Sequence, residues 1–140
     1  MVETISKDNV ILFHQKIIEI TGGSMGIRDE KLLDSALNRG FSTFDGEYLY
    51  KSDVEKISAI THSLISNHAF VDGNKRIGIS IMLLLLKLNK IEITYTQDML
   101  IDLGLGVASN KYSHNDILEW INSRTINVKL KMQTFDHIRM

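Results

Sequence analysis

Apolar residues recur along most of this chain at the three- and four-residue spacing of an amphipathic helix. The first such stretch follows Ser6, whose side chain can cap a helix, and Gly22-Gly23 supplies the left-handed stop that helix ends favour. Asp29 can cap a second helix over residues 30–38. Since proline is absent, glycine has to interrupt the helices.

The helical spacing breaks over residues 41–50, where Asp45-Gly46 is a turn signal between two aromatic-bearing flanks. We therefore expect a short β-hairpin, or flap, at this point. Ser52 and Glu55 then have the spacing of a capping box, which predicts the start of another helix.

The second half of the chain begins with a helix expected over residues 74–88. This helix is apolar on nearly every side, which is typical of a helix buried by its neighbours, and we expect it to be the central one. Residues 91–95 alternate and predict a short extended piece. Thr96 can cap the next helix, and Ser113 with Asp116 resembles a capping box before the last.

About six helices and one possible hairpin predict an all-α, bundle-like domain. We expect residues 1–124 to form this domain and residues 125–140 to be a C-terminal tail that is disordered or ordered by a partner. The length of 140 residues is close to the modal size of one domain, and 44% hydrophobic residues supply a core.

The charge balance and the absence of cysteine exclude several classes of protein. Lys+Arg (16) and Asp+Glu (17) nearly cancel, so the chain lacks the surplus positive charge of a general nucleic-acid binder. Without cysteine there is no zinc knuckle, disulfide framework or thiol catalysis. The richest apolar stretch, residues 77–88, is too short to span a membrane. We expect a cytoplasmic protein with no direct nucleic-acid or membrane partner.

The candidate chemistry lies where a loop enters the 74–88 helix. The start of a helix presents unpaired N–H groups and the positive end of the helix dipole, so it binds anions. Gly73 lets a phosphate approach the backbone and Asn74 can cap the helix. Lys75 and Arg76 place positive charge where the dipole disfavours it, and such violations are expected at functional sites. These four residues are candidates for holding phosphates.

Two further side chains precede that helix. His68 can take a proton from a hydroxyl group, a role for which histidine is the commonest side chain. Asp72 is an oxygen ligand suited to Mg²⁺, which usually binds one or two carboxylates together with substrate phosphates. A base, a metal ligand and a phosphate site are the parts required to transfer a phosphoryl or nucleotidyl group.

The segment from His68 to Arg76 resembles the Fic signature, H-x-F-x-(D/E)-(G/A)-N-(G/K)-R. Chance agreement at seven such positions is on the order of one in a million at average residue usage. Residues 22–29 and 32–37 are similar to the opening of Doc-type proteins of the Fic/Doc family. The resemblance extends over about Ser6 to Ser123.

Two departures from the AMP-transferring Fic pattern match the Doc, or death-on-curing, branch. Lys75 occupies the place of a glycine, and Ile79 stands where a second arginine would be. The resemblance implies a Fic-fold protein kinase that transfers the γ-phosphate of ATP to a Thr or Ser hydroxyl of elongation factor Tu and so inhibits translation. It also implies His68 as the base, Asp72 as the Mg²⁺ ligand, and Gly73, Asn74, Lys75 and Arg76 as phosphate-positioning residues.

The same resemblance implies the toxin of a type II toxin–antitoxin module, with a cognate antitoxin as partner. The rival activity is AMP transfer by a variant motif. A catalytically degenerate Fic fold kept for binding, and a helical interaction domain with no nucleotide site, are the non-enzymatic alternatives. The flap could dock the target segment by strand-like pairing. His14, His114 and His137 are expected to be isolated. His62 lies six residues from His68, which does not put two ligands on one helical face, so we expect no zinc site.

Overall fold

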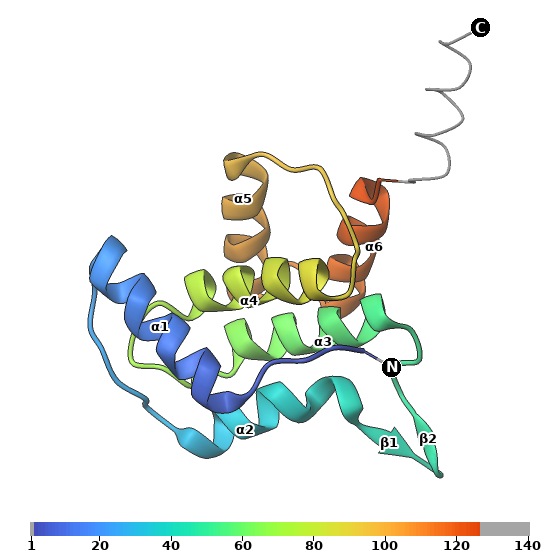
Figure 1. Cartoon of the computed structure of the whole chain (residues 1–140), viewed down its shortest axis with the longest axis horizontal. Coiled ribbons are helices and arrows are strands. Elements are labelled where there is room, and N and C mark those ends of the chain that lie inside the picture. Colours follow the sequence, from blue (N-terminus) through green and yellow to red (C-terminus); the bar gives the residue numbers. More distant parts are fainter. Residues whose placement is uncertain (1, 127–140) are drawn as a thin grey trace, which may run out of the picture.

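The computed structural model describes residues 2–126 and confirms an all-α fold with one short hairpin (Figure 1). In chain order its elements are α1 (Lys7–Thr21), α2 (Glu30–Asn38), the 3-10 turn η1 (Arg39–Phe41), β1 (Thr43–Phe44), β2 (Glu47–Tyr48), α3 (Asp53–Ser66), α4 (Asn74–Leu88), α5 (Gln97–Ala108) and α6 (His114–Arg124).

Five of the six helices in the described part of the chain begin at a capping side chain that the sequence predicts. Each accepts a hydrogen bond from the backbone N–H three residues later; they are Ser6, Asp29, Ser52, Thr96 and Ser113. The reciprocal capping box between Ser113 and Asp116 is confirmed. The predicted box at Ser52 is only half formed, because the Glu55 carboxylate accepts from the N–H of Lys51 instead.

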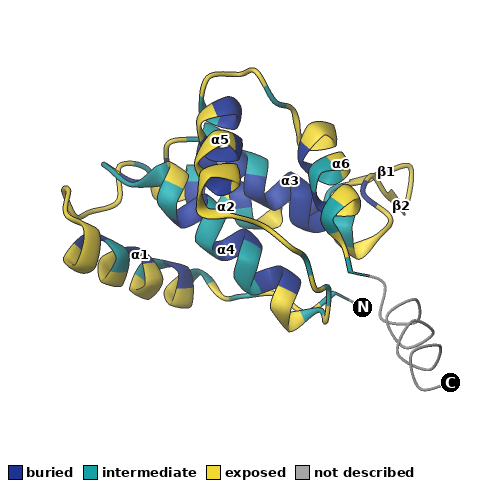
Figure 2. Ribbon diagram, turned by 90° about the horizontal axis from the view of Figure 1, so that it is seen from above, coloured by how far each residue is buried: buried dark blue, intermediate teal, exposed yellow. Residues whose placement is uncertain are grey.

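The central helix is α3, so the prediction that residues 74–88 would be central was wrong. Figure 2 shows α3 largely dark blue, and it packs against α2, α4, α5 and α6. Nine of its residues are buried: Lys56, Ile57, Ser58, Ala59, Ile60, Thr61, Ser63, Leu64 and Ile65. In α4, Leu83 and Leu84 are half-buried and Leu88 is 43% exposed.

Several of the buried residues of α3 are small or carry a hydroxyl group. Glycines on neighbouring elements lie against this helix: a Cβ at Gly40 would lie 2.8 Å from the Lys56 carbonyl oxygen, and a Cβ at Gly78 would collide with Ile65. Ser58 Oγ donates to the Val54 carbonyl (2.7 Å) and Thr61 Oγ1 to the Ile57 carbonyl (2.8 Å). Since these hydroxyls are satisfied within the helix, their burial costs little. Counting the apolar residues in a helix therefore underestimates how deeply α3 is buried.

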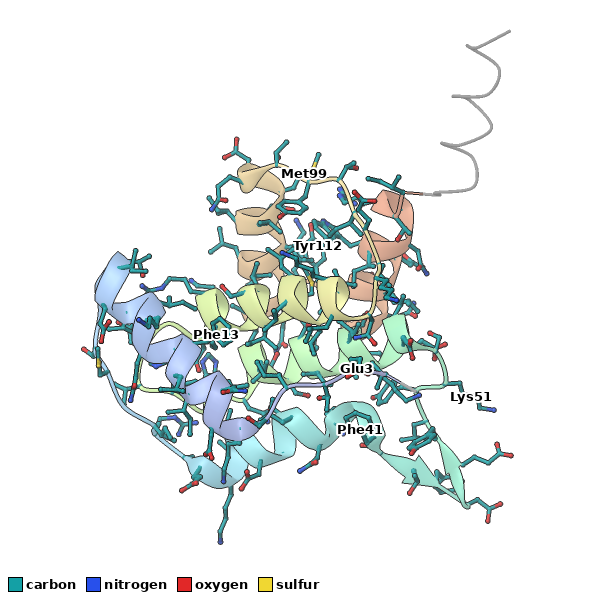
Figure 3. The ribbon with its side chains drawn as sticks, in the orientation of Figure 1. Glu3, Phe13, Phe41, Lys51, Met99 and Tyr112 are labelled. Carbon is teal, nitrogen blue, oxygen red and sulfur yellow. The ribbon has the colours of Figure 1, made fainter. Side chains whose placement is uncertain are left out.

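The predicted hairpin forms, with β1 and β2 antiparallel and Asp45-Gly46 at the turn. Both turn residues have positive φ (53° and 80°), the backbone of the tight turn that matches strand twist. Lys56 holds the base of the hairpin against α3. Its ammonium donates to the carbonyl oxygens of Tyr50 (2.5 Å) and Lys51 (3.1 Å); Figure 3 marks Lys51 on this side.

The last described residues pair with the piece that precedes α5. Ile93 and Thr125 form an antiparallel bridge, and Ile126 N–H donates to the Glu92 carbonyl (2.8 Å). Thr125 and Ile126, the first two residues of the expected tail, thus pair with the rest of the fold. The remainder of that prediction lies outside the described residues. No helix within residues 2–126 combines the length and hydropathy needed to cross a membrane.

Candidate active site at the start of helix α4

The loop of residues 67–73 joins α3 to α4 and is held by the segment that precedes α2 (Figure 1). Ile27 pairs with Phe70 in an antiparallel bridge, and the N–H of Arg28 donates to the Ala69 carbonyl (2.7 Å). Phe70 is 2% exposed, so the centre of the loop is anchored in the core as the sequence predicts. The side chains at either end of the loop are thereby positioned.

His68 is exposed and has a left-handed backbone (φ 51°). This conformation is uncommon for residues other than glycine, and it recurs at functional sites where the surroundings enforce it. Arg28 enforces it here, because its Nε donates to the His68 carbonyl (2.6 Å) and its Nη2 to the Asn67 carbonyl (3.1 Å). Residue spacing does not reveal this role of Arg28, because its partners lie about 40 residues away.

Asp72 is ionised at neutral pH and fixed by backbone donors. Its Oδ2 accepts from the N–H of Ser24 (3.0 Å) and its Oδ1 from the N–H of Gly73 (2.8 Å). These two hydrogen bonds, foremost the one from Ser24, lower the pKa of Asp72, and the charges of Arg76 (3.6 Å) and His14 lower it further.

The donor set at Asp72 fits a Mg²⁺ ion that also binds phosphate oxygens. The carboxylate side chain is 45% exposed, so it can reach a ligand. Each of its oxygens accepts one hydrogen bond from the described residues and retains acceptor capacity. One ionised carboxylate beside a phosphate site is the usual environment of Mg²⁺ in phosphoryl-transfer enzymes.

Because Gly23 has no side chain, its backbone can lie close to the Asp72 carboxylate. A Cβ at this residue would lie 2.4 Å from Asp72 Oδ2, and its φ of 115° disfavours any side chain. Gly22, one residue earlier, also has a positive φ (87°), but a Cβ there would meet nothing within 4 Å. The second glycine of the pair is therefore the one that the site requires.

Helix α4 starts at Gly73 (φ 76°), which has no side-chain cap, unlike the other five helices of residues 2–126. The predicted cap, Asn74, is instead the first helical residue. Its Oδ1 accepts from the Phe70 N–H and its Nδ2 donates to the Phe70 carbonyl, both at 3.0 Å. The first turn of α4 thus keeps backbone N–H groups for an anion.

His14 belongs to this site, so the prediction that it is isolated was wrong. It is 1% exposed, and its ring stacks on Phe70 with centroids 3.9 Å apart. Its Nε2 lies 2.7 Å from the Asp72 carbonyl oxygen. Since that oxygen only accepts, His14 Nε2 donates, and the backbone beneath the Asp72 carboxylate is held from α1.

Lys75 and Arg76 lie at one end of a groove between α1, α4 and α5. The groove has a volume of about 420 Å³. Arg76 Nη1 donates to the Gly22 carbonyl (2.7 Å) and to Thr21 Oγ1, which ties α4 to the end of α1. The other lining residues are mostly apolar: Ile17, Ile79, Leu83, Leu100, Ile101, Gly104 and Leu105, with Ser80 and Gln97.

The hairpin and the His68 loop lie at opposite ends of α3 (Figure 1). A helix of 14 residues separates them by about 20 Å at 1.5 Å per residue. His62 is not part of the loop either; its ring faces His114 at a centroid distance of 6.4 Å, so the prediction that His114 is isolated was wrong. The same prediction for His137 lies outside the described residues.

Comparison with known proteins gives the family. The sequence model of the Fic/DOC family matches residues 4–86, which include the whole loop and the start of α4. A relative named Toxin Doc, from Mycolicibacterium smegmatis (strain ATCC 700084 / mc(2)155), is 36% identical over 78 residues. That match covers 56% of this chain and 60% of the relative. The chain therefore belongs to the Fic/DOC family.

Proposed function

We propose that the protein is a Doc-like kinase, the toxin of a type II toxin–antitoxin module, which transfers the γ-phosphate of ATP to a Thr or Ser hydroxyl of elongation factor Tu. The observation that supports it best is the start of α4. An uncapped helix terminus and Gly73 lie beside an ionised Asp72, with Lys75 and Arg76 in the same turn. This arrangement suits the phosphates of Mg-ATP.

Lys75 and Ile79 favour transfer of the γ-phosphate over transfer of AMP. Both residues line the groove between α1, α4 and α5, one turn apart on α4. Ile79 offers no charge to a phosphate at the position where AMP-transferring relatives have an arginine. A lysine in place of glycine fills space next to the helix start. We infer that ATP binds in the orientation that presents its γ-phosphate to the acceptor.

In the proposed reaction, His68 accepts the proton of the acceptor hydroxyl as the oxygen attacks the γ-phosphorus. The bond from that phosphorus to the β,γ-bridging oxygen breaks, and ADP leaves. When bound, Mg²⁺ would neutralise charge that develops on the phosphates. Arg28 holds the His68 backbone, and the N–H groups of the first turn of α4 orient the phosphates.

The experiment that tests this proposal follows the label from ATP into purified elongation factor Tu. With γ-labelled ATP the target should be labelled, and His68→Ala should abolish the labelling. Label from α-labelled ATP would establish AMP transfer instead and overturn the kinase. If His68→Ala, folded and expressed like the parent, still stopped growth, a binding module would be the correct interpretation.

The proposed antitoxin would bind the groove between α1, α4 and α5. Its apolar lining suits one face of an amphipathic helix, and Lys75 and Arg76 at its end suit a carboxylate on that helix. Occupation of the groove would obstruct the phosphate site. Leu105→Lys, at a position that is 52% exposed, should weaken neutralisation by co-expressed antitoxin without unfolding the toxin.

A further inference from the structure

A second polar pocket lies between η1, α3 and α6, on side chains that the proposed phosphotransfer does not use. Its volume is about 240 Å³, below the range that holds a whole drug-sized ligand. It is lined by Ser35, Arg39, Tyr50, Ala59, His62, Ser63, Ser66, Asn67 and His114. Every lining side chain except Ala59 carries a hydrogen-bond donor, and none is a carboxylate.

The positive groups of this pocket lack an anionic partner. Within residues 2–126, no ion pair joins Arg39, His62 or His114 to a carboxylate. The Arg39 guanidinium lies 5.9 Å from the Tyr50 ring centroid, and Tyr50 packs edge-on against His114 at 5.3 Å. Three groups that can be positive are therefore gathered around one small space.

The charged groups around this pocket are not balanced by negative charge within residues 2–126. Burial lowers the pKa of His62, and the positive charges of His114 and Arg39 lower it further. His114 is also the first residue of α6, where the helix dipole adds partial positive charge. An anion among these groups would stabilise the protonated form of His62.

Two serines supply an independent observation. Ser66 Oγ is buried and has no hydrogen-bond partner within residues 2–126, which is rare in a folded protein. Ser63, one turn earlier on α3, is 9% exposed and also lines the pocket. A buried hydroxyl without a partner, such as Ser66 Oγ, is suited to donate to an oxyanion when it lies beside a cationic cluster.

We propose that this pocket is a binding site for a phosphate monoester or a free phosphate ion, distinct from the nucleotide site. Arg39 and His114 would provide the charge. The α3 hydroxyls would provide hydrogen bonds, together with the one Asn67 Nδ2 hydrogen that does not donate to the Leu32 carbonyl. The volume admits one tetrahedral group rather than a nucleotide. Asn67 directly precedes His68, so the bound group would lie beside the loop that carries the proposed base.

The test is an NMR pH titration of the His62 ring in the full-length protein, with sodium phosphate against sodium chloride at matched ionic strength. If phosphate binds the protein with a protonated His62 about tenfold more tightly than the protein with a neutral His62, the pKa of His62 rises by about one unit. O-phosphoserine, titrated in parallel, distinguishes a phosphate monoester from a free phosphate ion as the ligand. If it binds more tightly than phosphate, the ligand of this pocket is a phosphorylated side chain. Either ligand raising the pKa supports the site.

Variants with matched controls test whether the phosphate-dependent shift in the pKa of His62 arises from this pocket. Arg39→Gln and His114→Gln should each abolish the phosphate-dependent shift, while Lys16→Gln, which removes an exposed positive charge from α1, should leave it unchanged. Arg76→Gln should also leave it unchanged, because the nucleotide site is separate; the outcome is thus independent of whether the protein is a kinase. The proposal is overturned if neither phosphate nor O-phosphoserine raises the pKa of His62 above its value in chloride, or if the shift survives Arg39→Gln.

Discussion

The ring of His14, on α1, stacks on the ring of Phe70, with centroids 3.9 Å apart and planes 12° from parallel. The same ring donates to the Asp72 carbonyl. One buried side chain thus holds the loop both through its apolar anchor and through the backbone of the proposed magnesium ligand. The contact links the first helix to the start of α4, two elements that the sequence separates by more than 50 residues.

His14→Phe should therefore separate the two contacts. The variant keeps an aromatic ring against Phe70 but leaves the Asp72 carbonyl without its donor, which should reduce the free energy of unfolding by about 1–3 kcal/mol. Labelling of the target should fall as Asp72 loses its position. Urea denaturation and the labelling rate check this; Phe13→Leu, a change at an exposed α1 position, is the control. Wild-type labelling by His14→Phe would contradict the positioning role.

Gly23→Ala should impair the site far more than Gly22→Ala. Both residues have positive φ, so each substitution should cost about 1 kcal/mol of backbone strain. Only at Gly23 would the methyl group collide with Asp72. We expect Gly23→Ala to lower the labelling rate at least about tenfold, which corresponds to about 1.4 kcal/mol in the barrier. Equal rates in the two variants would show that the contact with Asp72 does not matter.

Asn74→Ala should destabilise the loop, because it removes both hydrogen bonds to the Phe70 backbone. Partly buried polar groups left without partners should reduce the free energy of unfolding by about 1–3 kcal/mol. Asn74→Asp keeps an acceptor for the Phe70 N–H and loses the donor to its carbonyl. Its stability, measured by thermal unfolding, should lie between those of Asn74→Ala and the parent. An unchanged Asn74→Ala protein would argue against the clamp.

Acid should remove the contribution of Asp72 to stability. Folding lowers the pKa of this carboxyl, so its stabilising effect is fully present above the unfolded pKa, about 3.9, and is lost as the pH falls through the lower folded pKa. The difference in unfolding free energy between the parent and Asp72→Asn should therefore narrow below about pH 4. Urea denaturation of both proteins between neutral and acid pH measures it. A constant difference would contradict the lowered pKa.

Much of this fold could be predicted because the interactions involved join residues that are close together in the sequence. Ser6, Asp29 and Thr96 cap helices by hydrogen bonds that reach only three residues, so their spacing in the sequence reveals them. The turn at Asp45-Gly46 is similarly local. The parts of the candidate site within residues 68–76 are contiguous, so they too could be found from sequence.

Contacts between distant segments could not be predicted in the same way. Arg28 reaches the His68 carbonyl, and His14 reaches Asp72, across 40 and 58 residues. The pairing of His62 with His114 depends on how α6 packs against α3. The central place of α3 depends on which elements pack against it: α2, α4, α5 and α6. Each of these features requires the tertiary arrangement, which residue spacing alone does not contain.

The most direct measurement of the central claim is a titration of the ¹⁵N-labelled protein with Mg-ATP, followed through its backbone amide signals. If phosphates bind the uncapped start of α4, the amides of Asn74, Lys75 and Arg76 should show the largest shifts, and these should diminish in Asp72→Asn. Shifts that centre elsewhere in the fold, or none at millimolar Mg-ATP, would contradict the assignment of this helix start as the nucleotide site.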